Sequence, residues 1–131
     1  SLGSARLARL GPYRDYKSYY LGLYEEGKPG WVATQKAIRD LGQMLREDGI
    51  PGTVILLPEL HEPRNFGPFT GLFASVRKVA EESGFEVIDP SHRFPPGAGE
   101  KFWVSHEDAH PTAEAQGFYA EELAKSAYAC R

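Results

Sequence analysis

The chain has 131 residues, of which 41% are hydrophobic and 25% are charged, and its formal net charge is -3. These values lie close to the averages of soluble globular domains, so they exclude a disordered, fibrous or membrane-embedded protein and favour one compact domain. The charges form no block of one sign, which argues against nucleic acid or an anionic membrane as a partner.

The ends of the chain say little about its compartment. The single cysteine, Cys130, excludes a disulfide within the chain, and localisation stays undetermined. No segment approaches the roughly 18 apolar residues of a membrane-spanning helix, and the segment Ser1–Leu10 is too polar for a secretory signal. The chain does not begin with methionine, which favours processing or trimming of a longer protein.

The first thirty residues contain several tyrosines but no clear strand, and we expect a loop or a broken helix that packs aromatic rings. A helix is then predicted from about Trp31 to Asp48, because apolar residues recur there at spacings of three and four. Gly49 and Pro51 supply its C-terminal stop. The residues of the stripe are Trp31, Thr34, Ile38, Leu41 and Leu45.

The next segments repeat a strand and helix pattern. Thr53–Leu57 is a short apolar run rich in β-branched residues, which predicts a buried parallel strand. A helix over about Leu72–Ala80 ends at Gly84, and Phe85–Asp89 forms a second strand. This alternation is typical of an α/β layered fold with a parallel sheet.

After Pro90 we expect a long irregular stretch to about Ala109, followed by a last helix over Thr112–Tyr128 with Thr112 as its N-cap. The two predicted strands are too few for a parallel sheet, because such sheets are normally covered on both faces and contain several strands. We therefore expect that part of the fold is missing from this chain.

The segment from His106 to Pro111 carries the candidate chemistry. Reactive groups of open parallel sheets gather in loops beyond the carboxyl ends of the strands. Here Asp108 and His110 provide a carboxylate beside a histidine, the arrangement that activates a hydroxyl as general base. His106, Glu107 and His110 also match a zinc-protease pattern, but that pattern needs a continuous helix, which Pro111 disfavours.

The C-terminal block resembles the last block of the SGNH, or GDSL-like, ester hydrolases: Phe102–Ser105, then Asp108-Ala109-His110-Pro111-Thr112, then a helix with Ala120-Glu121-Glu122-Leu123. The likeness extends over roughly Tyr19–Ala127. It implies a three-layer α/β/α, flavodoxin-like fold. Residues 1–131 would be the C-terminal part of that fold, with its last two parallel strands, and residues 1–30 would be an irregular lead-in. It also implies His110 as catalytic base and Asp108 as its orienting carboxylate.

The chain departs from that family at three points. Glu107 stands three residues before His110, where many members place Asp, so either Asp108 or Glu107 partners the histidine. Thr112 replaces the common Asn and keeps an N-cap. No Gly-Asp-Ser turn and no Gly-x-Asn-Asp segment occurs, so the nucleophile and most of the oxyanion hole are missing. We do not expect another serine of the chain to serve as the nucleophile; the disfavoured residues are Ser4, Ser75, Ser91 and Ser105.

Other polar and aromatic residues have weaker patterns. His61 follows the first strand and could line the cleft, and His92 follows the second, although a solvated loop position is the plainer interpretation of each. Phe66, Phe69 and Phe73 could form a platform for an acyl or sugar group, but aromatic residues at a helix start more often belong to the core.

We therefore expect the C-terminal portion of a carboxylic ester hydrolase that carries the His-Asp part of a Ser-His-Asp triad, needs no metal or organic cofactor, and is inactive without the serine-containing half. The identity of the ester substrate stays open, and so does the choice between hydrolysis and acyl transfer. The alternative is a non-catalytic interaction module. In both cases the partner, either the missing half or a second copy, is expected at the edge of the strand Thr53–Leu57.

Overall fold

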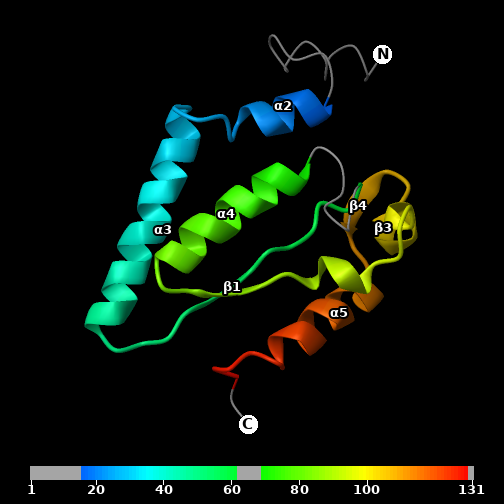
Figure 1. Cartoon of the computed structure of the whole chain (residues 1–131). Coiled ribbons are helices and arrows are strands. Elements are labelled where there is room, and N and C mark those ends of the chain that lie inside the picture. The colour runs from blue at the N-terminus through cyan, green and yellow to red at the C-terminus, as the bar shows by residue number, and fades with distance from the viewer. Residues whose placement is uncertain (1–15, 62–68, 130–131) are drawn as a thin grey trace.

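The structure is a computed structural model that describes residues 16–61 and 69–129. These residues form a mixed α/β structure with two small sheets (Figure 1). The helices and strands are α2 Tyr16–Gly22, α3 Pro29–Glu47, β1 Thr53–Ile55, α4 Thr70–Glu82, β2 Glu86–Ile88, β3 Trp103–Ser105, β4 Asp108–Pro111 and α5 Ala113–Leu123, with 3-10 helices η2 Pro90–Arg93 and η3 Gly99–Phe102.

The first sheet confirms the predicted crossover: β1 and β2 are parallel, with Val54 opposite Val87, and α4 connects them. The strands are shorter than expected, because β1 ends at Ile55 and not at Leu57. Both strands are half-buried, whereas the sequence predicted a buried strand for the first of them. The reason is that each has only one neighbour among the described residues, so the sheet has few surfaces around it.

The helices lie on opposite sides of this strand pair, with α4 on one side and α5 on the other (Figure 1). Pro29 begins α3 at a position where its missing N–H costs nothing, and Gly49 follows the helix with φ 65°, which glycine adopts without strain. The helices α3 and α4 approach closely at Gly42, where an added Cβ would lie 3.0 Å from the Cβ of Ser83 and would overlap the Ser83 carbonyl oxygen.

The stretch after Pro90, predicted to be irregular, contains two 3-10 helices and a hairpin. β3 and β4 are antiparallel, with Ser105 opposite Asp108 and an irregularity in register between Trp103 and Ser105. The prediction missed this hairpin because its strands are three and four residues long and contain a proline, which sheets tolerate only at edges and bulges.

The last helix has the predicted N-cap but a different end. The Thr112 hydroxyl accepts a hydrogen bond from the N–H of Ala115, which confirms the cap. α5 ends at Leu123, whereas the prediction ran to Tyr128. The residues beyond it instead bind Glu86 of β2, whose carboxylate accepts hydrogen bonds from the Ser126 hydroxyl and the Ala127 N–H. This long-range contact competes with continued helix formation.

The core beneath the hairpin is mainly aromatic. The rings of Phe94 and Phe102 are fully buried and meet edge to face, with centroids 5.0 Å apart. Around them pack Leu60, Ala115 and Tyr119, so residues that follow β1, the segment η2–η3 and α5 share one cluster. This core connects the hairpin to the carboxyl end of β1.

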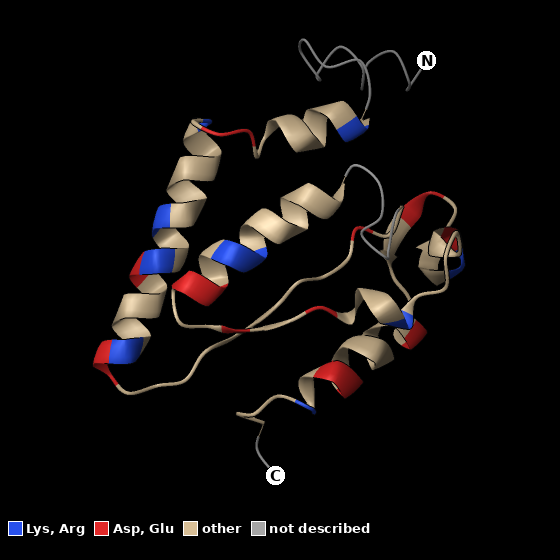
Figure 2. Cartoon of the chain, in the orientation of Figure 1, with Lys and Arg blue, Asp and Glu red and all other residues tan. Residues whose placement is uncertain are grey.

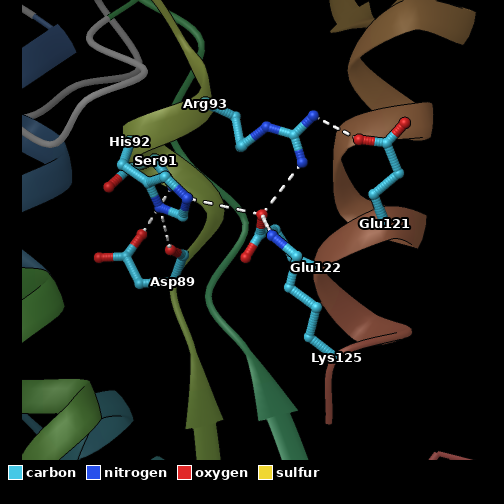
Figure 3. Close-up of polar contacts among 7 residues, drawn as sticks. All are labelled: Asp89, Ser91, His92, Arg93, Glu121, Glu122 and Lys125. Atoms are coloured by element: carbon cyan, nitrogen blue, oxygen red, sulfur yellow. Dashed lines mark hydrogen bonds and ion pairs between the residues drawn. The ribbon is translucent and has the colours of Figure 1, made fainter.

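The segment η2 is also attached to α5 by an ionic cluster (Figure 3). Arg93 donates to Glu121 and, at 3.0 Å, to Glu122, and Lys125 donates to Glu122 at 2.7 Å. His92 Nε2 lies 3.5 Å from the same Glu122 oxygen. The hydrogen bonds from Lys125 and then Arg93 lower the pKa of the Glu122 carboxyl, whose side chain is largely buried. The cluster therefore holds Glu122 ionised.

The tyrosine-rich lead-in is helical where it is described. In α2 and the turn after it, Tyr16, Tyr20 and Tyr24 form a row of ring contacts, and Tyr24 continues it to Trp31. The expected aromatic packing is confirmed, as a helix and not as a loop. The earlier residues of the lead-in, 1–15, lie outside the described residues.

The helices α3 and α4 each carry side chains of both signs (Figure 2). Several form pairs one helical turn apart, such as Lys36 with Asp40 and Arg77 with Glu81. The helices α3 and α4 therefore carry charges of both signs and not a single-sign face. Within residues 16–61 and 69–129, no helix combines the length and the apolar character needed to cross a bilayer.

Candidate functional site

The predicted pair Asp108 and His110 lies on β4, and its two side chains are in contact. His110 Nδ1 lies 2.5 Å from Asp108 Oδ1, and the backbone N–H of His110 donates to the same oxygen at 3.0 Å. These two hydrogen bonds, the backbone bond first, lower the pKa of the Asp108 carboxyl. An ionised carboxylate accepts only, so Nδ1 donates the proton and Nε2 of the neutral ring is left as a base.

The backbone around this pair is fixed from both sides. β4 pairs with β3, and after it the N–H of Thr112 donates to the Phe102 carbonyl at 2.9 Å. Thr112 then caps α5. His110 therefore sits two residues before a capped helix on a paired strand, and not in the open loop that the sequence suggested. Its side chain is nevertheless 86% exposed, and that of Asp108 is 46% exposed.

The pair borders a cavity of about 460 Å³. The cavity lies where the chain leaves β1, so the prediction that the reactive pair meets the carboxyl end of a parallel strand agrees with this geometry. α2, α4 and α5 contribute the remaining walls. The lining residues are Tyr16, Tyr20, Leu57, Pro58, Glu59, Leu60, His61, Phe73, Glu107, Asp108, Ala109, His110, Pro111 and Tyr119.

A second histidine and carboxylate pair lines the same cavity. His61 Nδ1 lies 2.5 Å from Glu59 Oε1, and the His61 N–H donates to Glu59 Oε2 at 2.8 Å. The His61 ring contacts the rings of Trp103 and Tyr16, with centroids 4.8 and 5.5 Å away. Sequence reasoning favoured a solvated loop histidine here. The repeated spacing, Glu59-x-His61 and Asp108-x-His110, was the available signal.

The tyrosines on α2 contribute neutral hydroxyl groups to the cavity. Burial raises the pKa of Tyr16, and burial followed by the neighbouring Tyr24 raises the pKa of Tyr20 to about 12. Both phenols therefore stay protonated at neutral pH, so they can donate as well as accept hydrogen bonds. The remaining wall is largely apolar.

The geometry of the hairpin bears on two further predictions, the role of Glu107 and the zinc-protease pattern. Glu107 lines the cavity in the turn between β3 and β4, but the carboxylate that contacts His110 is that of Asp108. His106 lies in the same turn and His110 on a strand, so the continuous helix that the zinc pattern needs is absent. Within the described residues, no group of three or more His, Cys, Asp or Glu side chains is arranged to hold a metal ion.

No serine stands among the cavity residues just given. Ser75 lies within α4 and donates to the Gly71 carbonyl, Ser91 lies in η2 and Ser105 ends β3. Ser4 falls outside the described residues, as does Cys130. The described part of the chain thus places a base and a carboxylate on the cavity without a serine nucleophile beside them.

The remaining candidate residues differ in whether they line the cavity. His92 belongs to the ionic cluster on η2 and α5 (Figure 3) and is not among the cavity residues. Phe73 lines the cavity, whereas Phe69 is completely buried and contacts the ring of Tyr20. Phe66 lies outside the described residues.

Comparison with protein-family models, with curated proteins and with solved structures found no match to this chain.

Proposed function

We propose that this chain is the C-terminal part of an SGNH-type serine ester hydrolase and carries the base and the orienting carboxylate of its active site. The observation that supports this most is the contact between Asp108 and His110 at a cavity beside the carboxyl end of β1. The pattern Asp-x-His-Pro-Thr before a capped helix, which suggested the family, has a local geometry compatible with that role.

In the proposed mechanism, Nε2 of His110 accepts the proton of a serine hydroxyl as the serine attacks the ester carbonyl. The protonated imidazole then donates that proton to the leaving alcohol, and an acyl-enzyme remains. In the second half, His110 accepts a proton from the water that attacks the acyl-enzyme, and it then returns this proton to the serine oxygen as the acid is released. Asp108 keeps the proton of the ring on Nδ1 throughout, so Nε2 stays available.

The serine and the oxyanion donors would come from a segment of the longer protein that precedes this chain. Two features fit such a complement. β1 and β2 are half-buried and form a sheet of only two strands within the described residues. The His110 side chain is 86% exposed, and a serine-bearing surface laid against it would cover the ring.

The test is an assay of two proteins, this chain and the longer protein. We expect the longer protein to contain a Gly-Asp-Ser turn ahead of Tyr19 and to hydrolyse p-nitrophenyl esters. This chain alone should be inactive, because it lacks a nucleophile. Robust hydrolysis by this chain alone, abolished by substitution of one of its own serines, would contradict the proposal.

The second candidate is a non-catalytic module that pairs its open sheet edge with another chain. The observation that favours it is that β1 has one neighbour among residues 16–61 and 69–129, together with the exposed Leu57 that follows the strand. This candidate predicts self-association at micromolar concentration in sedimentation. Ile55→Lys should shift the species toward monomer, and a monomeric wild-type chain would remove the support for self-pairing.

A further inference from the structure

The pair formed by Glu59 and His61 has no task in the mechanism above, since ester hydrolysis through an acyl-enzyme uses one base. The pair nevertheless repeats the geometry of Asp108 and His110. In each, a carboxylate two residues earlier accepts from both the ring Nδ1 and the backbone N–H of the histidine. Both pairs line the same cavity.

The contacts of this second pair fix what it presents to the cavity. The Glu59 carboxylate accepts hydrogen bonds and cannot donate them, so the proton of the neutral His61 ring lies on Nδ1 and Nε2 is a hydrogen-bond acceptor. The Glu59 side chain is 12% exposed, which keeps the carboxylate away from competing water. The ring is held by edge contact with Trp103, whose Nε1–H donates to the Leu60 carbonyl at 3.1 Å.

A purely structural role explains these contacts less well. A histidine that only supports the fold would be covered by its partners, but the His61 side chain is 42% exposed and lines the cavity. Around it the wall is mostly carbon, from Leu57, Phe73 and the Tyr16 ring. An oriented acceptor in such a wall favours a ligand that is largely apolar but carries a hydrogen-bond donor. A ligand without that donor would leave the acceptor unpaired.

We propose that His61, positioned by Glu59, accepts a hydrogen bond from a hydroxyl group of the substrate, so that the site prefers esters that carry a further hydroxyl. This inference rests on the proposed function for the identity of the substrate as an ester. The binding step belongs to the described residues alone, because the pair, its aromatic neighbours and the cavity wall all lie within this chain.

The binding test uses this chain with labelled histidine side chains and follows the ring resonances by NMR. The probes are glycerol 1-acetate and propyl acetate, which have the same carbon skeleton but differ in two hydroxyls. We expect glycerol 1-acetate to shift the His61 resonances at concentrations about tenfold lower than propyl acetate does, because one net hydrogen bond changes the affinity by about that factor. His61→Phe should remove this preference, whereas the control His92→Phe, outside the cavity, should keep it.

The turnover test uses the longer protein and the same two esters. His61→Phe should lower the ratio of kcat/KM for glycerol 1-acetate to that for propyl acetate about tenfold, mainly through KM, and His61→Gln, which retains an acceptor, should restore part of it. Equal binding of the two probes by the wild-type chain, or an unchanged ratio in His61→Phe, would overturn the inference. If neither ester is hydrolysed, the proposed function fails, while the NMR preference still decides the role of His61.

Discussion

The two histidine and carboxylate pairs share a spacing and a cavity, but their surroundings differ. Glu59 is nearly buried, and the His61 ring rests against Trp103 and Tyr16. Asp108 is about half exposed, and the His110 ring is almost fully exposed on the edge of a hairpin. The first pair is therefore covered by this chain to a greater extent, whereas the second has a free face. We interpret that free face as the side at which a serine-bearing segment would close the site.

The largest expected effect is on turnover, and it should distinguish His110 from His61 as the catalytic base. In the longer protein, His110→Ala should lower kcat for p-nitrophenyl acetate by about three orders of magnitude or more, because the serine then has no base. Circular dichroism should show an unchanged fold, since the exposed ring contributes little packing. A loss smaller than about tenfold would assign the base elsewhere, and His61 would be the first alternative to examine.

The next effect concerns the carboxylate beside His110. Asp108→Asn in the longer protein should lower kcat by about a hundredfold or more, because the amide no longer fixes the Nδ1 tautomer. Glu107→Gln, in the adjacent turn, should change kcat by less than about threefold. Steady-state kinetics of the two variants measure this difference. The opposite order would give the orienting role to Glu107.

A stability test addresses the packing of α3 against α4, which lies away from both pairs. Gly42→Ala places a Cβ against the Ser83 backbone and should lower the free energy of unfolding by about 1–3 kcal/mol. The control is Gly117→Ala in the interior of α5, where an added Cβ meets no described atom within 4 Å, and it should raise stability by about 0.5–1 kcal/mol. Urea denaturation distinguishes the two, and an equal effect of both would contradict the close approach.

The smallest effect tests the ionic cluster that joins η2 to α5. Glu122 has a lowered pKa, chiefly through Lys125, so its ionised form stabilises the fold at pH values above its ordinary pKa of 4.5. This stabilisation is lost as the pH falls below 4.5 through the lowered value. Glu122→Gln should therefore reduce stability at pH 7 and flatten its dependence on acid pH. Thermal unfolding at several pH values measures this, and Glu121→Gln, at a 63% exposed side chain, should change the curve much less.

The sequence predicted the parts of the fold that depend on local pattern. The apolar stripe before Gly49 placed α3 within two residues of its ends, and the N-cap at Thr112 is confirmed. The end of α5 was wrong because Glu86, forty residues earlier than Ser126, binds the residues beyond Leu123. Such a contact leaves no periodic signal.

The site was predictable to a similar extent. The pair Asp108 and His110 could be found because both residues stand in one short pattern before a helix. The sequence placed His61 after the first strand, but it could not show the ring contacts of His61, since Trp103 lies forty-two residues later and Tyr16 lies in the lead-in. The hairpin that brings Trp103 there is too short for a strand pattern to reveal.

The most direct test of the central proposal is covalent labelling of the longer protein with a fluorophosphonate, a reagent that reacts with a serine activated by a nearby base. We expect one labelled serine, in a segment that precedes this chain, with labelling slowed by at least about a hundredfold in His110→Ala and unaffected by His92→Phe. Absence of labelling in the longer protein, or labelling that is equally fast in His110→Ala, would contradict the role proposed for His110.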